Sequence, residues 1–262
     1  MKRLPLLLCT ICLVTLSHAQ EWSKTFNLTG TPNLRVHTSD AKLTVDTWDQ
    51  NRIEAHVYVT GYKIGPGGIQ IDDNQSGDTV SLEVRYPKTE FHVMTVKSHR
   101  VEIEIHMPRQ GRVDLRTGDG NIRLTGLKGE MTITSGDGSQ DLEDVEGVLH
   151  ARAGDGHIRA SGRFDGLSLH TGDGRIDATA RSESTMKNDW DIHAGDGSVT
   201  LRIPDKFAAN VDFETKDGHL DVDMPLTVSG RIKDNVIRGT INGGGNLLTI
   251  HTGDGSIRVE RS

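Results

Sequence analysis

The sequence predicts an all-β protein: a parallel β-solenoid of two-strand rungs, preceded by a less regular N-terminal β region. Three observations support this prediction. A Gly-Asp-Gly triplet recurs along the chain, apolar residues stand at fixed positions around each triplet, and no stretch after residue 19 shows helical apolar periodicity. The aspartates of the first four triplets, Asp119, Asp137, Asp155 and Asp173, are 18 residues apart, and the later gaps widen to 23, 21 and 37 residues. The spacing indicates one repeat unit with insertions.

The N-terminus has the three parts of a secretory signal peptide. Met1-Lys2-Arg3 is the charged region, Leu4 to Leu16 is the apolar region, and Ser17-His18-Ala19 is a small-residue cleavage site. The apolar run is shorter than the roughly 20 residues that span a bilayer, so we expect cleavage after Ala19 and not a membrane anchor. The predicted destination is the periplasm, the cell surface or the medium. The predicted divisions are 1–19 as signal peptide, 20–110 as irregular β rungs and 111–262 as the regular solenoid, with 20–262 forming one continuous domain.

Cysteine content and charge exclude several classes of stabilisation and partner. Both cysteines, Cys9 and Cys12, lie in the signal segment, so the exported chain has neither disulfides nor thiolate metal ligands. The formal charge is -7, and losing Lys2 and Arg3 makes it -9. An acidic chain of this kind is not expected to bind nucleic acid or an anionic membrane surface.

The N-terminal region alternates apolar and polar residues less regularly. Leu34 to Val45 alternates on both sides of Ser39-Asp40, which is typical of a worn copy of the later repeat. Three further alternating stretches are predicted to be strands: Ile53–Val59, Thr79–Val84 and Val101–Met107. Two segments rich in glycine, proline, aspartate and asparagine are predicted to be turns or loops: Gly65–Gly68 and Asp72–Asp78.

Around each later Gly-Asp-Gly triplet, apolar residues stand six and four positions before the aspartate and three and five after it. Seven copies, six with Gly-Asp-Gly and one with the degenerate Lys216-Asp217-Gly218, give 28 such positions, and only Gln140 among them is polar. Two strands of period 2 joined by a tight turn explain this frame. A single copy cannot bury its apolar side, so we expect the copies to stack with parallel pairing between equivalent strands.

The insertions are predicted to lie outside the ladder. Thr179–Lys187 and Pro204–Lys206 are expected to be loops on one edge. The 37 residues from Asp217 to Asp254 are close to two periods, which predicts one degenerate rung around Val228–Ile241.

We assign the triplets as structural turns and not as ligand sites. Calcium-binding β-rolls need an aspartate-bearing glycine turn on both sides of every coil, whereas the opposite corner here, Gly126–Gly129, has no aspartate. Asp-Gly is also a favourable pair in tight turns for conformational reasons, and small residues around it avoid collision with the next copy. The turn residues are Gly118, Asp119, Gly120, Gly136, Asp137, Gly138, Gly154, Asp155, Gly156, Gly172, Asp173, Gly174, Gly195, Asp196, Gly197, Asp217, Gly218, Gly253, Asp254 and Gly255.

The outward positions form rows of their own. Four residues after the turn aspartate come Arg123, Asp141, Arg159 and Asp177, whose alternating signs predict an exposed salt-bridge ladder. Three residues before it the row includes His170 and His193, which are candidate metal ligands if their rungs are adjacent; the alternative is that they are ordinary exposed histidines.

The sequence contains no motif of a known catalytic centre. A Gly-x-Ser-x-Gly elbow, a His-Glu-x-x-His helix, a phosphate loop and a reactive cysteine are all absent. We therefore expect a protein that is not an enzyme, with no catalytic residues and no cofactor.

Three segments carry a resemblance to a known family: Met107–Ile122, Ile203–Leu220 and Leu248–Val259. They resemble the bacterial "putative adhesin" family of β-strand repeats, a domain of unknown function, and the resemblance extends over about residues 34–260. It implies a β-solenoid on an exported or envelope protein and supplies no catalytic residue.

The leading functional hypothesis is a non-enzymatic, adhesin-like scaffold that binds an envelope or extracellular polymer or protein. The partner would be an unknown envelope protein or a polysaccharide, with no nucleic acid and no membrane span in the exported chain. One alternative is a calcium- or metal-dependent binding module or an uncharacterised envelope enzyme. A third hypothesis is a periplasmic structural or regulatory protein.

Overall fold

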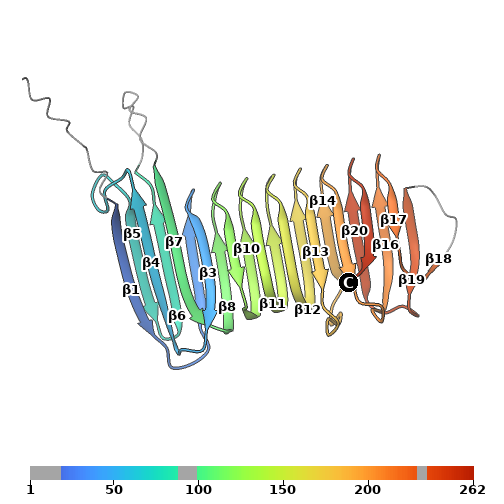
Figure 1. Ribbon diagram of the computed structural model, residues 1–262, viewed down its shortest axis with the longest axis horizontal. Helices are drawn as coiled ribbons and strands as arrows, with labels where there is room; N and C mark the ends of the chain where they lie inside the picture. The colour runs from blue at the N-terminus through green and yellow to red at the C-terminus, as the bar shows by residue number, and fades with distance from the viewer. Residues whose placement is uncertain (1–18, 88–98, 229–234) are drawn as a thin grey trace, which may run out of the picture.

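The computed structural model describes residues 19–87, 99–228 and 235–262, which form an elongated stack of β-strands (Figure 1). The all-β prediction is confirmed, because the described residues contain 21 strands and no helix. No helix in these ranges is long and apolar enough to cross a membrane. The predicted signal peptide, apart from Ala19, lies outside the described residues.

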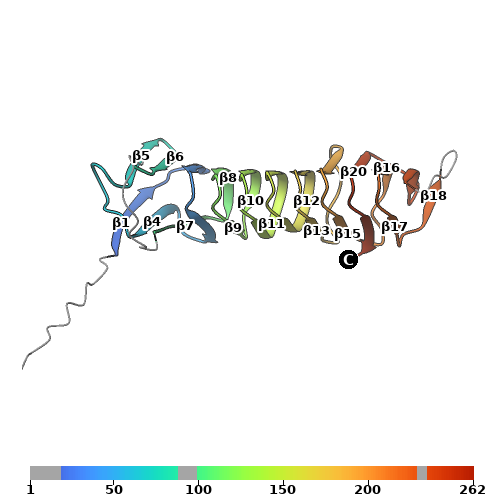
Figure 2. The same ribbon diagram turned by 90° about the horizontal axis from the view of Figure 1, so that it is seen from above.

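The strands form two faces on either side of an apolar interior (Figure 2), and the long strands β11 and β12 contribute to both. The first face runs, in order of pairing, through β5 (Gln70–Ser76), β6 (Thr79–Arg85), β2 (Asn33–Thr38), β8 (Gln110–Arg116), β10 (Lys128–Thr134), the second half of β11 (Gln140–Arg152), the second half of β12 (Ile158–Thr171), β14 (Trp190–Ala194), β20 (Leu247–Thr252), β16 (Ala209–Thr215), β19 (Val236–Ile241) and β18 (Leu226–Val228).

The second face runs through β1 (Gln20–Asn27), β4 (Arg52–Thr60), β7 (Arg100–Pro108), β3 (Lys42–Trp48), β9 (Ile122–Thr125), the first halves of β11 and β12, β13 (Ile176–Ala180), β15 (Val199–Ile203), β21 (Ile257–Arg261) and β17 (Leu220–Val222).

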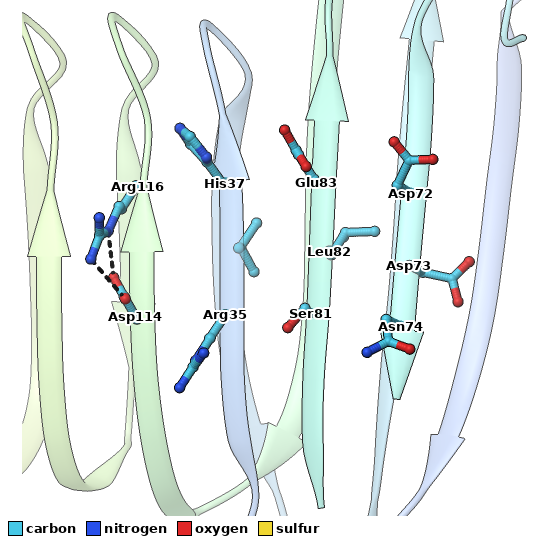
Figure 3. Close-up of a pocket in the computed structure, with 11 residues that line it drawn as sticks. Arg35, His37, Asp72, Asp73, Asn74, Ser81, Leu82, Glu83, Asp114 and Arg116 are labelled. Carbon is cyan, nitrogen blue, oxygen red and sulfur yellow. Dashed lines mark hydrogen bonds and ion pairs between the residues drawn. The ribbon is translucent and has the colours of Figure 1, made fainter. Parts of the chain in front are cut away.

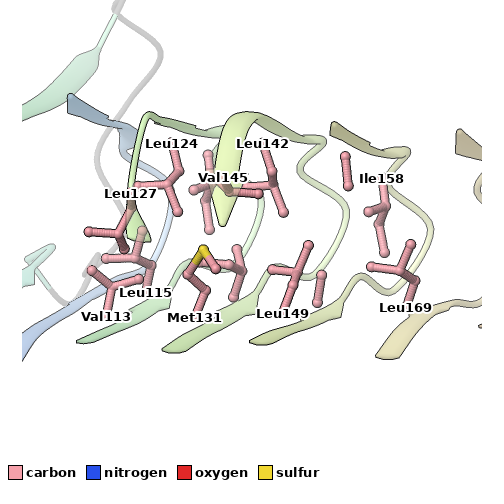
Figure 4. Packing of buried hydrophobic residues seen from close by; sticks show 14 of the residues in the cluster. Val113, Leu115, Leu124, Leu127, Met131, Leu142, Val145, Leu149, Ile158 and Leu169 are labelled. Atoms are coloured by element: carbon pink, nitrogen blue, oxygen red, sulfur yellow. The ribbon is translucent and has the colours of Figure 1, made fainter. Parts of the chain in front are cut away.

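Each rung is a first-face strand, a Gly-Asp-Gly turn and a second-face strand, and neighbouring rungs pair in parallel. Met131, for example, is opposite Val113 on one side and Leu149 on the other. Because side chains alternate along each strand, the same register sends every predicted apolar position into the interior, where the two faces meet (Figure 4). All 28 predicted positions are buried except Leu220 and Val222. These two are half-buried on β17, which lies at the end of the stack and, among the described strands, pairs only with β21.

Gln140, the one polar residue among the 28 predicted positions, is buried and only partly satisfied. Its Nε2 donates to Ser135 Oγ at 2.9 Å and to the Arg152 carbonyl at 2.6 Å. Its Oε1 is buried and has no hydrogen-bond partner among the described residues. Both acceptors have other partners: the Arg152 carbonyl also accepts the Ser135 N–H, and Ser135 Oγ donates to the Gly138 carbonyl.

We predict that Gln140→Met stabilises the protein by about 1 kcal/mol. Methionine has a similar shape, removes the unpaired Oε1 and leaves no other group without a partner, since the two acceptors keep theirs. The measurement is urea unfolding of both proteins. Gln140→Ala is the control and should be destabilising, because it opens a cavity at the same place; a Met variant that is less stable than the wild type would contradict the prediction.

The turn glycines are required by contact between rungs. A Cβ on Gly138 would lie 2.0 Å from the Gly120 carbonyl oxygen, and one on Gly156 would lie 2.2 Å from the Gly138 carbonyl oxygen. None of the turn glycines has a positive φ. The conformational reason expected for Asp-Gly pairs is therefore wrong here, and the steric reason accounts for glycine: no side chain fits between turns that stack this closely.

The rungs do not stack in the order of the sequence at the C-terminal end. The last copy is inserted between the two copies that precede it, so that β20 lies between β14 and β16 and β21 lies between β15 and β17. The degenerate rung predicted around Val228–Ile241 is wrong. β18 and β19 instead pair antiparallel, and β19 covers the open edge of β16 (Figure 1).

The strands at the N-terminal end also stack in an order that differs from their order in the sequence. The worn copy, β2 and β3, stacks directly on β8 and β9, while β6 and β7 lie outside it and β1, β4 and β5 close the end with antiparallel pairs. Asp72–Ser76 is strand β5 and not the predicted loop. Its polar side chains suit an edge strand, its backbone pairs with β6, and Gly77 with φ of 59° supplies the turn between them.

Candidate functional site

All seven turn aspartates are exposed at one edge of the stack. The residues two positions before them carry a structural role that sequence reasoning missed. The Thr171 hydroxyl donates to the carbonyls of Gly154 at 3.1 Å and Gly156 at 2.9 Å, and the hydroxyls of Thr215 and Thr252 make equivalent bonds to the turn beside them. The recurrence of threonine two positions before the turn aspartate is the sequence feature that could have indicated these hydrogen bonds. The turns are thus held to one another by their own backbone and threonine hydroxyls.

A groove of about 420 Å³ lies on the second face beside the turns, over β3, β9, β11, β12 and β13; we call it the second-face groove. Its charged walls are Lys42, Arg123, Arg159, Arg175, Asp141 and Asp177. These side chains belong to two neighbouring outward rows, two and four residues after the turn aspartates, and parallel pairing places equivalent members side by side on successive strands.

Side-chain-to-backbone bonds fix the row nearer the turns. Asn121 Oδ1 accepts the Ser139 N–H at 2.9 Å, and His157 Nδ1 accepts the Arg175 N–H at 3.0 Å. Nδ1 is thus the acceptor nitrogen of the His157 ring, and Nε2 is not used in this bond. The side of the second-face groove nearer the turns is therefore an ordered polar ladder.

Most of the cations in the second-face groove are not neutralised. Of the predicted salt-bridge ladder, Arg123 and Asp141 pair at 2.7 Å, while Arg159 lies in register between Asp141 and Asp177 without forming a salt bridge to any described residue. Lys42 and Arg175 likewise form none within the described ranges. The groove thus carries four cationic side chains against two carboxylates on a chain with a net charge of -7.

A second groove, of about 400 Å³, lies on the first face near the N-terminal end, over β2, β5, β6 and β8 (Figure 3). Its charges are mostly paired. Arg116 donates to both carboxylate oxygens of Asp114, at 2.8 and 2.9 Å, Asp72 pairs with Arg85 and Asp73 pairs with Lys24. The hydrogen bonds to Asp114 raise the pKa of Arg116 further above its ordinary value. This groove offers fewer free charges to a ligand.

The predicted metal candidates, His170 and His193, are opposite each other on β12 and β14, with ring centroids 6.2 Å apart. His170 Nε2 lies 2.7 Å from Asp191 Oδ2. Insertion of the last copy adds His251 on the far side of His193 and then Glu214, so three histidines are consecutive in this row. This arrangement could not be predicted from the order of the sequence. His251 comes 37 residues after Glu214 in the chain, but in the stack it lies between His193 and Glu214.

None of the curated proteins is a match for this chain. Three solved structures resemble it at low identity. A "putative cell adhesion protein" from Clostridium sporogenes has 14% identity and a TM-score of 0.46, with 94% of this chain and 100% of that chain covered. A "putative lipid binding protein" from Parabacteroides distasonis has 12% identity and a TM-score of 0.42, with 93% and 98% covered. A "putative adhesin" from Bacteroides fragilis has 12% identity and a TM-score of 0.35, with 92% and 97% covered.

The sequence profile of one family covers nearly the whole chain. The profile described as Toastrack DUF4097 matches residues 23–260, a range that includes residues of all the described strands. The match confirms the resemblance seen in the repeats. The chain belongs to the Toastrack DUF4097 family.

Proposed function

We propose that the protein is an exported, non-enzymatic β-solenoid scaffold, adhesin-like in role, which binds an acidic polysaccharide of the envelope or its surroundings in the second-face groove. The observation that carries the proposal is the excess of cations in this groove, where Lys42, Arg159 and Arg175 form no salt bridge to the residues that the structure describes, on an otherwise acidic protein.

The spacing of these cations favours a polymer. Lys42 and Arg175 lie four strands apart in one row, roughly 19 Å at about 4.8 Å per strand, with Arg159 between them in the neighbouring row, and the backbone beneath them is fixed by continuous pairing. An extended chain with regularly spaced carboxylates or sulfates can therefore contact several cations at once without ordering a loop, which keeps the entropic cost of binding small.

The test is binding of the purified protein to an array of acidic and neutral glycans, followed by titration of the best ligand at low and high salt. We expect saturable binding to acidic glycans that weakens with ionic strength, since exposed charges are screened by salt. Removing three exposed contacts of about 0.5 kcal/mol each, in Lys42→Ser/Arg159→Ser/Arg175→Ser, should reduce affinity by roughly tenfold.

A matched control removes the same charge from the opposite face. Arg35, Arg112 and Arg152 are exposed on β2, β8 and β11, and their replacement by serine should leave glycan affinity within about twofold of the wild type. The second-face groove would be ruled out as the binding surface if the protein showed no saturable binding to any acidic glycan. It would also be ruled out if both triple variants lost glycan affinity equally.

A further inference from the structure

The insertion of the last copy brings together Asp212, Glu214 and His251, which the sequence keeps apart. Asp212 and Glu214 lie two residues apart on β16, so both side chains point outward on the same face. β20 pairs with β16 in parallel, with His251 opposite Glu214 and Thr249 opposite Asp212. One ligand atom from each of the three side chains lies within 4.8 Å of the other two.

The histidine of this cluster is the poorly satisfied member. His251 Nε2 is a buried atom with no hydrogen-bond partner among the described residues, and it lies 4.0 Å from Asp212 Oδ1, too far to bond it. Asp212 Oδ1 is also buried, and its close neighbour is the Arg238 guanidinium, whose Nε forms an ion pair with it at 3.1 Å. The outer side is accessible, because the Glu214 side chain is 48% exposed and can move toward a shared ion.

A cationic side chain already occupies the position where positive charge is favoured. Arg238, on the antiparallel strand β19, places its Nε 3.1 Å from Asp212 and its guanidinium Nη2 3.4 Å from Glu214. The two carboxylates therefore attract a cation in this geometry, and the guanidinium is the group that an ion would displace.

We infer that Asp212, Glu214 and His251 form a binding site for a divalent transition-metal ion of the zinc class. One imidazole and two carboxylates are nitrogen and oxygen donors that suit zinc, nickel or cobalt, whereas calcium prefers oxygen ligands alone. Three protein ligands leave a coordination position open to water or a partner, and the next residue of the row on that side is His193, opposite His251. The site does not depend on the second-face groove, which lies on the other face.

The test is isothermal titration of the purified protein, prepared without a histidine tag, with Zn²⁺, Co²⁺ and Ca²⁺. We expect one saturable site for Zn²⁺, a visible absorption band on Co²⁺ loading, and no calcium binding at the site. His251→Gln and Asp212→Asn should each weaken Zn²⁺ binding by at least about tenfold.

Two further variants separate a metal site from a simple ion pair. Arg238→Gln removes the competing guanidinium and should tighten Zn²⁺ binding by several-fold. His150→Gln removes an exposed histidine of the same face whose strand neighbours are Thr132 and Ser168, and Zn²⁺ affinity should not change. Circular dichroism of each variant confirms the fold. Zn²⁺ affinity that is unchanged in both His251→Gln and Asp212→Asn, or lost in Arg238→Gln, would overturn the inference.

Discussion

Gly156→Ala is expected to destabilise the protein by about 3 kcal/mol, although it adds only one methyl group, at a buried turn position. The new Cβ would lie 2.2 Å from the Gly138 carbonyl oxygen and 2.7 Å from its carbon. These are backbone atoms in a ladder paired on both sides, so neither rung can move away without breaking inter-strand bonds. Thermal unfolding should show the midpoint lowered by roughly 6–12 °C.

Two controls isolate this effect. Gly166 is a buried glycine of β12 where an added Cβ would be 3.4 Å from Val148 Cγ1, an ordinary contact, so Gly166→Ala should change stability by less than about 1 kcal/mol. Asp155→Ala changes the exposed aspartate of the same turn and should also have a small effect. A Gly156→Ala protein as stable as these controls would refute the steric origin of the triplet.

Trp190→Ala is expected to cost about 3–5 kcal/mol, the largest loss from any single core truncation. Trp190 is the largest fully buried side chain, with ring centroids 6.1 Å from Phe164 and 5.0 Å from Phe207. It also lies opposite Leu248, so it packs where the inserted last copy meets the central rungs. Chemical denaturation measures the loss.

Trp190→Phe is the informative partner of this variant. The indole Nε1 is buried and has no hydrogen-bond partner in the described part of the chain, so phenylalanine removes an unpaired donor while keeping an aromatic ring against Phe164 and Phe207. Removing the unpaired, buried N–H donor is stabilising, and the smaller volume of phenylalanine is destabilising. Because the two effects offset each other, we expect a free energy of unfolding within about 1 kcal/mol of the wild type. A phenylalanine variant as unstable as the alanine variant would contradict this balance.

The rung itself could be predicted from the sequence because its apolar positions are set by local geometry. Side chains alternate along a strand, so Val113 and Leu115 before a turn, with Ile122 and Leu124 after it, fix which sides are buried. The polar edge strand at Asp72–Ser76 was predicted to be a loop because it lacks such an apolar pattern. It is held by backbone pairing with β6, which the sequence does not reveal.

The order of the rungs, and with it the cluster at His251, could not be predicted. Phe213 and Ile250 are both apolar at the same position of their copies, so either strand can pack beside Ile192, and the alternation does not distinguish between them. The order of the rungs is set by long-range packing and by the lengths of the connections. In the structure Leu248 lies opposite Trp190, and β19 of the β18–β19 pair covers the edge of β16.

The inserted position of the last copy also constrains the time course of folding. A chain synthesised from its N-terminus presents the edge of β14 and β15 before Leu248–Val259 has been made, while β16 and β17 are already available. Strands β14 to β17 therefore cannot reach their final pairing before β20 and β21 have been made, and until then the edge of β14 is open to β16. Most of a solenoid can grow one rung at a time, but this one is completed by a strand pair that closes a gap.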